Sequence, residues 1–176
     1  TGSYDAELDL LYWGIGNPSS DFYGEDRRGL NLYTNCIVAL DPDTGQRKWH
    51  FQEIPYDVWD WDAAYEQVLI DLPVNGEVRK LLINPNKGGY TYVLDRVTGE
   101  FIGAWPHAKN ITWITGIGPN GELQGRNEPP PNQPVVLCPS ICGGRSWNHA
   151  AYSPKTGLFY QTGLEFCQEV TAEKQE

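Results

Sequence analysis

Residues 36–49 read CIVALDPDTGQRKW, and residues 90–105 read YTYVLDRVTGEFIGAW. Each stretch has an apolar run, then the turn pattern D-x-x-T-G at residues 41–45 and 95–99, then a second run that suits a β-strand. Glycine accepts the positive φ angle that such a tight hairpin requires. Strand hairpins that recur about every 50 residues are typical of β-propellers, in which each blade is a four-stranded sheet. The repeat therefore predicts an all-β fold, a partial β-propeller of about three blades.

The segments around the repeat also favour short strands joined by turns. Several segments are rich in β-branched, aromatic and leucine residues and are bounded by Gly, Pro or Asn. We expect strands at residues 10–14, 37–41, 47–52, 67–72, 79–84, 90–95 and 158–163. Residues 109–133 are predicted to form a long irregular segment that caps one end of the propeller, and residues 168–176 a frayed polar tail.

The composition narrows the partners that the chain can have. A net charge of −10 argues against nucleic acid, whose phosphates require Lys and Arg. No apolar run approaches the roughly 18 residues that span a membrane, and no signal peptide is visible. The 176 residues are enough for one domain with a hydrophobic core. The chain begins at Thr1 and contains no Met, so we expect a fragment or a processed product.

Residues 57–62 read DVWDWD and carry the densest candidate chemistry. In an extended segment Asp60 and Asp62 face the same side, about 7 Å apart. Two carboxylates this close raise each other's pKa unless a cation lies between them. The pattern therefore favours a hard metal ion, a shared proton or both, and the simpler alternative is a solvated acidic turn beside core tryptophans.

The repeat resembles the tryptophan-docking motif of quinoprotein alcohol dehydrogenases. The matching residues are Ala39, Asp41, Gly45 and Trp49. In that family the tryptophan stacks between neighbouring blades. The second copy departs from the motif, because Val93 replaces the alanine and Trp105 comes two residues late, so altered docking is expected there. Non-catalytic propellers such as the outer-membrane assembly lipoprotein share the motif, so a protein-binding scaffold is the alternative function.

Two further motifs resemble those of pyrroloquinoline quinone (PQQ) enzymes of the methanol dehydrogenase type. Residues 14–18, GIGNP, are similar to the family's G-x-G-N-P signature, which implies that Asn17 binds the metal. Residues 55–60, PYDVWD, are similar to P-x-D-x-W-D, whose final Asp is the family's proposed catalytic base. The resemblance therefore assigns both the base and a metal contact to Asp60.

Asp62 bears on the identity of the metal. Calcium-dependent methanol dehydrogenases carry a small apolar residue at this position, and the lanthanide-dependent branch carries Asp. A trivalent ion gains more from an added carboxylate than Ca²⁺ does, so the resemblance favours a lanthanide such as La³⁺ or Ce³⁺. The alternative is that Asp62 is an acceptor in the outer shell of a calcium site.

Two more residues are implied to contact PQQ. Residues 84–89, NPNKGG, resemble the loop whose basic residue bonds the quinone oxygens, which implies that Lys87 stabilises the oxyanion of the reduced quinone. Residues 139–148 resemble the segment that ends in a PQQ-bonding Asn, here Asn148. His149 is interpreted as structural.

The four cysteines fit an exported protein. Cys138 and Cys142 lack a matching second pair, so zinc is disfavoured and a disulfide is the expected use of one pair. The resemblance implies that Cys138 pairs with Cys167 and that the protein is periplasmic. Cys36 and Cys142 are left without a role.

Together the resemblances imply that residues 1–176 are an internal fragment of a single PQQ-binding domain, an eight-bladed propeller with tryptophan-docking repeats. They imply oxidation of a primary alcohol to an aldehyde, in which Asp60 removes the hydroxyl proton and hydride passes to PQQ bound beside Ca²⁺ or a lanthanide. A cytochrome c is the expected electron acceptor. The remaining blades, and with them part of the site, are expected to lie outside this chain.

Overall fold

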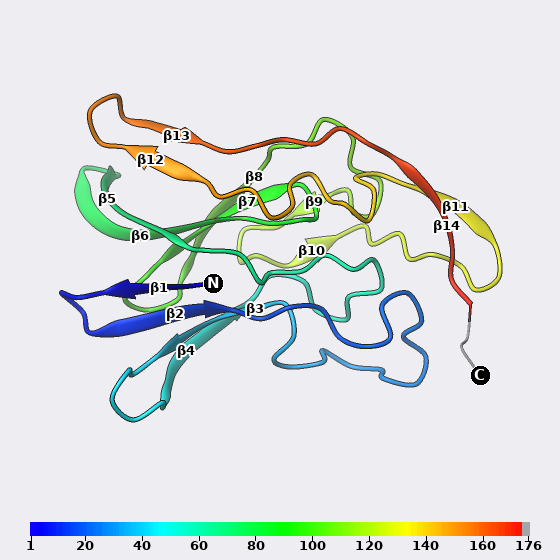
Figure 1. Cartoon of the computed structure of the whole chain (residues 1–176), viewed down its shortest axis with the longest axis horizontal. Helices are drawn as coiled ribbons and strands as arrows, with labels where there is room; N and C mark the ends of the chain where they lie inside the picture. The colour runs from blue at the N-terminus through cyan, green and yellow to red at the C-terminus, as the bar shows by residue number, and fades with distance from the viewer. Residues whose placement is uncertain (174–176) are drawn as a thin grey trace.

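The computed structural model describes residues 1–173, in which two four-stranded antiparallel sheets are joined by long loops (Figure 1). The first sheet contains, in sequential order, β1 (Gly2–Asp5), β2 (Leu10–Gly14), β3 (Cys36–Leu40) and β4 (Arg47–Gln52). The second contains β5 (Val68–Val74), β6 (Glu77–Pro85), β7 (Tyr90–Asp95) and β8 (Phe101–Pro106). Sequentially ordered four-stranded sheets are the blades of a propeller, so the predicted all-β fold is confirmed.

The C-terminal part of the chain forms two-stranded pairs. These are β9 (Gly116–Ile117) with β10 (Leu123–Gln124), β11 (Pro134–Leu137) with β14 (Gln168–Thr171), and β12 (Ala151–Ser153) with β13 (Leu158–Tyr160). Tyr152 of β12 and Phe159 of β13 pack against the apolar cluster of the second sheet. This hairpin packs on the second sheet as a third blade would, but it has two strands where a blade has four.

Two expectations for this part of the chain need revision. The predicted frayed tail from residue 168 is wrong over residues 168–171, because β14 pairs with β11 and Val170 is buried. Residues 174–176 lie outside the described part. Residues 109–133 are mostly irregular, as expected, but they bury Trp113 in one core cluster with Trp59 and Trp61. The segment therefore contributes to the core.

The D-x-x-T-G pattern forms the same turn twice. The Asp41 carboxylate accepts a hydrogen bond from the Thr44 amide at 2.9 Å, and the Gly45 amide donates to the Asp41 carbonyl at 2.8 Å. Gly45 has a φ of +70°, which a residue with a side chain adopts only with strain. Residues 95–99 repeat these contacts, so the sequence repeat is also a structural repeat.

Trp49 connects the two sheets as the docking motif predicts. Its indole lies against Gly99, where an added Cβ would be only 2.7 Å from the Trp49 ring. The indole nitrogen donates to the Arg96 carbonyl at 3.2 Å, and the buried Tyr12 hydroxyl donates to the same oxygen at 2.9 Å. The first sheet is thus fixed to the turn between β7 and β8.

The second copy of the motif has lost this docking. In the strand pairing, Gly103 faces Val93 as Trp49 faces Ala39, so glycine occupies the position of the docking tryptophan. The side chain of Trp105 lies back over Gly103 and remains 57% exposed. The sequence irregularity therefore has the structural consequence that was expected.

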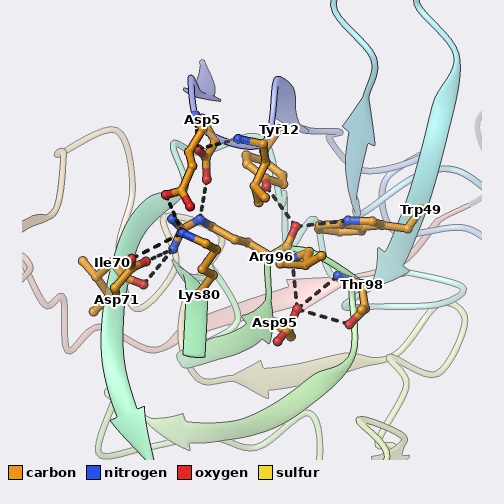
Figure 2. Close-up of polar contacts among 12 residues, drawn as sticks. Asp5, Tyr12, Trp49, Ile70, Asp71, Lys80, Asp95, Arg96 and Thr98 are labelled. Carbon is orange, nitrogen blue, oxygen red and sulfur yellow. Dashed lines mark hydrogen bonds and ion pairs between the residues drawn. The ribbon is translucent and has the colours of Figure 1, made fainter. Parts of the chain in front are cut away.

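Arg96 completes the junction between the two sheets (Figure 2). Its side chain is buried and donates to Asp5 of β1 at 2.6 Å, to the Ile70 carbonyl of β5 at 2.9 Å, and to the Asp71 carboxylate. One residue therefore joins both sheets through its side chain and through the carbonyl that Tyr12 and Trp49 share. Sequence analysis gave no indication of this role.

Within residues 1–173, no helix is long and apolar enough to cross a membrane.

Candidate functional site

In the loop between the two sheets, buried and half-buried side chains alternate along residues 59–62. Trp59 and Trp61 are fully buried in the core, whereas Asp60 and Asp62 are half-buried. Asp60 has a φ of +67°, an uncommon conformation for a residue with a side chain. The two tryptophans therefore anchor the loop in the core, and the two carboxylates remain partly accessible to solvent.

Lys87 lies between these two carboxylates. Its Nζ is 2.8 Å from Oδ2 of Asp60 and 3.0 Å from Oδ2 of Asp62. Burial disfavours the charged ammonium, but the hydrogen bond to Asp60 and the charge of Asp62 outweigh it, and the pKa of Lys87 is raised. Burial, partly offset by Lys87, also raises the pKa of Asp60. Because Lys87 contacts both carboxylates, they face one point, although the positive φ of Asp60 shows that the segment is not the extended one assumed from the sequence.

The loop that carries Lys87 is held by buried polar contacts. Asn86 accepts a hydrogen bond from the Gly88 amide at 2.7 Å and donates to an oxygen of the buried carboxyl group of Glu53 at 2.5 Å. Trp113 donates from its indole to the Gly88 carbonyl at 2.8 Å. The segment from residue 109 therefore supports the Lys87 loop, a contribution that sequence analysis missed.

Asn17 reaches the site from the end of β2. Its backbone amide donates to Oδ1 of Asp62 at 3.3 Å, and its side-chain Nδ2 donates to Asp21 at 2.7 Å. Since the amide nitrogen is engaged by Asp21, the carbonyl oxygen of the side chain is the end that can bind a cation. Asp21 was not predicted as part of the site, because nothing in its local sequence distinguishes it from a solvated loop residue.

Asn148 differs from the other four predicted residues. It is exposed, and its backbone carbonyl accepts a hydrogen bond from the buried Arg145. Among residues 1–173, no hydrogen bond joins its side chain to Asn17, Asp60, Asp62 or Lys87. The side chains of Asp60, Asp62 and Lys87 thus meet directly, and Asn17 joins them through its backbone amide.

Arg145 and Glu66 form an ion pair beside the site that sequence analysis missed. Arg145 donates to Glu66 at 3.0 Å and to the Pro85 carbonyl at 3.1 Å, two residues before Lys87. His149 lies 3.1 Å from Glu66 through its Nδ1. These contacts fix the segment before Asn148 against the Lys87 loop.

The predicted disulfide is confirmed. Cys138 and Cys167 are bonded, with their Cα atoms 4.5 Å apart. Cys36 is a buried thiol, and burial raises its pKa to about 12, so it remains protonated. Cys142 is a free and exposed thiol.

The donor set fits a hard cation but is incomplete. Two carboxylates and one amide are oxygen donors of the kind that Ca²⁺ and lanthanides bind, and such ions take six or more ligands. The ammonium of Lys87 between the carboxylates shows that this position stabilises positive charge. Within residues 1–173, no group of three or more His, Cys, Asp or Glu residues is arranged to hold a metal, so further ligands are needed.

Comparison with known proteins identifies the family to which this chain is similar. The PQQ family model, described as "Glucose/ethanol/alcohol dehydrogenase, beta-propeller domain", matches residues 1–107. The chain is 35% identical to the quinoprotein alcohol dehydrogenase PedH of Pseudomonas putida, over 96% of this chain and 30% of that protein. It is 36% identical to the lanthanide-dependent methanol dehydrogenase of Methylorubrum extorquens, over 95% of this chain and 30% of that protein.

The solved structure of a europium-containing methanol dehydrogenase has the same fold, with a TM-score of 0.93 at 34% identity. The match covers 99% of this chain and 31% of that chain. The chain therefore spans less than a third of the length of each of these three proteins. From its matched blades and its motifs, the chain belongs to the PQQ-dependent family of glucose, ethanol and alcohol dehydrogenase β-propellers.

Proposed function

We propose that the protein to which this chain belongs oxidises a primary alcohol to an aldehyde, with PQQ as the electron acceptor. The observation that carries the proposal is that the ammonium of Lys87 lies between two carboxylates, 2.8 Å from Oδ2 of Asp60 and 3.0 Å from Oδ2 of Asp62. The relatives named above are alcohol and methanol dehydrogenases, which supports the same class of reaction.

Asp60 acts as the base in this proposal. Its carboxylate accepts the hydroxyl proton of the alcohol. PQQ, when bound, would supply the acceptor for the hydride of the same carbon. Burial raises the pKa of Asp60 in the metal-free protein, and this favours its role as a proton acceptor. Lys87 orients Asp60 before the transfer and supplies a positive charge close to the reacting groups.

The cation would be held by Asn17, Asp60 and Asp62, together with ligands outside this set. When bound, it supplies a Lewis acid that favours reduction of the quinone. The second carboxylate, Asp62, favours a lanthanide over Ca²⁺, because a 3+ charge gains more from each anionic ligand. The lanthanide-dependent and europium-containing relatives support this choice.

The remaining predicted contacts and partners belong to the same proposal. Asn148 would bond PQQ through its side-chain amide, which lies on the segment fixed by Arg145. A cytochrome c would take the electrons. The disulfide between Cys138 and Cys167 supports a periplasmic location, since disulfides persist in oxidising compartments.

Reconstitution tests the proposal directly. The intact protein, freed of metal, is incubated with PQQ and either La³⁺ or Ca²⁺, and oxidation of short primary alcohols is followed by reduction of an artificial electron-accepting dye. Activity that requires both PQQ and an ion is expected. A protein that binds PQQ and ion but oxidises no alcohol would contradict the proposal and favour a protein-binding scaffold.

A further inference from the structure

A buried carboxylate outside the proposed ligand set supports the loop of Asp60. Asp57 is fully buried. Its Oδ1 accepts the amide of Trp59 at 2.8 Å, and its Oδ2 accepts the amide of Trp61 at 2.7 Å. These amides flank Asp60, whose φ of +67° is unfavourable by itself. Asp57 therefore stabilises the backbone conformation from which Asp60 and Asp62 project.

Asn35 connects Asp57 to the segment that carries Asn17. The Asn35 side chain is fully buried, and its Nδ2 donates to Oδ2 of Asp57 at 2.6 Å. Its backbone amide donates to the carbonyl of Gly16 at 3.0 Å. Gly16 directly precedes Asn17, so Asn35 links the segment of the amide donor to the loop of the two carboxylates.

The direct contact between the two segments is weaker than this link. The Asn17 amide is 3.3 Å from Asp62, which is long for a hydrogen bond, and Asp62 is half-buried. The bond between Asn35 and Asp57 is short, charge-assisted and buried, conditions under which hydrogen bonds are strong. Asn35 and Asp57 therefore form a buried link between the two segments, beside the close packing of Gly14 on the Ala63 carbonyl.

We propose that Asn35 and Asp57 are positioning residues that set the spacing of Asn17, Asp60 and Asp62, so that cation affinity depends on two side chains outside the proposed ligand set. The inference rests on the proposed function, because it presupposes the cation site. Residues that orient metal ligands typically contribute 10- to 100-fold to metal affinity.

Terbium luminescence provides the measurement. Tb³⁺ is a lanthanide whose emission is sensitised by nearby tryptophan, and Trp59 and Trp61 flank Asp60 in sequence. The intact protein, loaded with PQQ, is titrated with Tb³⁺ to obtain a Kd. Emission lifetimes in H₂O and D₂O then count the water molecules bound to the ion. Neither readout depends on turnover.

Two variants test the pair. Asp57→Asn keeps the shape of the side chain but replaces one of its two accepting oxygens with an NH₂ group, which can only donate. This variant should bind Tb³⁺ about 10- to 100-fold more weakly, and the bound ion should carry more water molecules. Asn35→Gly accommodates the φ of +48° at this position and keeps the backbone bond to Gly16, while it removes the side chain and with it the donor to Asp57. It should weaken binding in the same direction and by a smaller factor.

Asp5→Asn is the matched control. Asp5 is also a buried carboxylate that accepts two backbone amides and one side-chain donor, but it lies at the junction with Arg96. Its replacement should lower stability and change the Tb³⁺ Kd by no more than about twofold, since separate sites act independently.

The outcomes separate the inference from the function on which it rests. Wild-type protein that binds no Tb³⁺ would overturn the cation site and the inference together. Wild-type binding with an unchanged Kd in folded Asp57→Asn would overturn the inference alone. If Asp57→Asn does not fold, an unchanged Kd in Asn35→Gly overturns it in the same way.

Discussion

The ammonium nitrogen of Lys87 lies 2.8 Å from Oδ2 of Asp60, although the two residues belong to different loops. Asp60 follows the first sheet, and Lys87 lies between β6 and β7 of the second. The contact is therefore a product of how the two blades are fixed to each other. The geometry of the candidate site therefore depends on the junction between the two blades.

Lys87→Met should destabilise the metal-free protein by about 1–3 kcal/mol, because two half-buried carboxylates lose a hydrogen-bonded cation. Added La³⁺ should restore more stability in this variant than in the wild type, since the ion can replace the missing charge. Urea unfolding with and without the ion measures both effects. Lys48→Met, which removes a surface pair with Asp41, is the control and should have a clearly smaller effect on stability than Lys87→Met.

Arg96→Met should lower the free energy of unfolding by about 3–5 kcal/mol, because Asp5 is left as a buried charge without its partner. Urea unfolding followed by tryptophan fluorescence is the measurement. Arg28→Met breaks an ion pair whose arginine is 73% exposed, and should leave stability nearly unchanged. Equal effects of the two substitutions would remove Arg96 from the junction that we describe.

Glu53→Gln should flatten the pH dependence of stability. Burial raises the pKa of Glu53 from 4.5 to about 8 in the folded protein. Between these values the unfolded chain releases a proton that the folded protein keeps, so this group makes stability fall as pH rises from about 4.5 to about 8. The variant lacks this contribution. Unfolding free energies of both proteins across the window test the prediction, and parallel curves would contradict it.

Asp62→Ala should weaken lanthanide binding more than calcium binding. At equal distance and dielectric, a 3+ ion loses half again as much attraction as a 2+ ion when one carboxylate is removed. Metal-free wild type and variant are titrated with each ion and assayed. If the wild type works with calcium alone and Asp62→Ala leaves that activity intact, the lanthanide assignment is wrong.

The parts of the fold that sequence predicted are those with local causes. The turns at residues 41–45 and 95–99 follow from an Asp, a Thr and a Gly within five positions, and the strands beside them follow from apolar runs. β14 was missed because its sequence is largely polar and its pairing with β11 comes from far along the chain.

The candidate site also contains residues that the sequence could predict and residues that it could not. Asp60 and Asp62 could be placed together from their spacing, and Lys87 from a family resemblance. The roles of Arg96, Asn35 and Arg145 could not be predicted, because each depends on partners brought close only by packing of the blades. A buried Arg or Asn has no local sequence pattern that distinguishes it from an exposed one.

Asp60→Asn in the intact protein is the most direct test of the central claim, that Asp60 is the base of a PQQ-dependent alcohol oxidation. The variant keeps the size of the side chain and removes its ability to accept the proton. Bound PQQ is quantified from its absorption, and kcat is measured with a saturating primary alcohol and ion. The account predicts unchanged PQQ content and a kcat lowered by roughly 10² or more. Near-normal turnover in a variant with full PQQ content would contradict it.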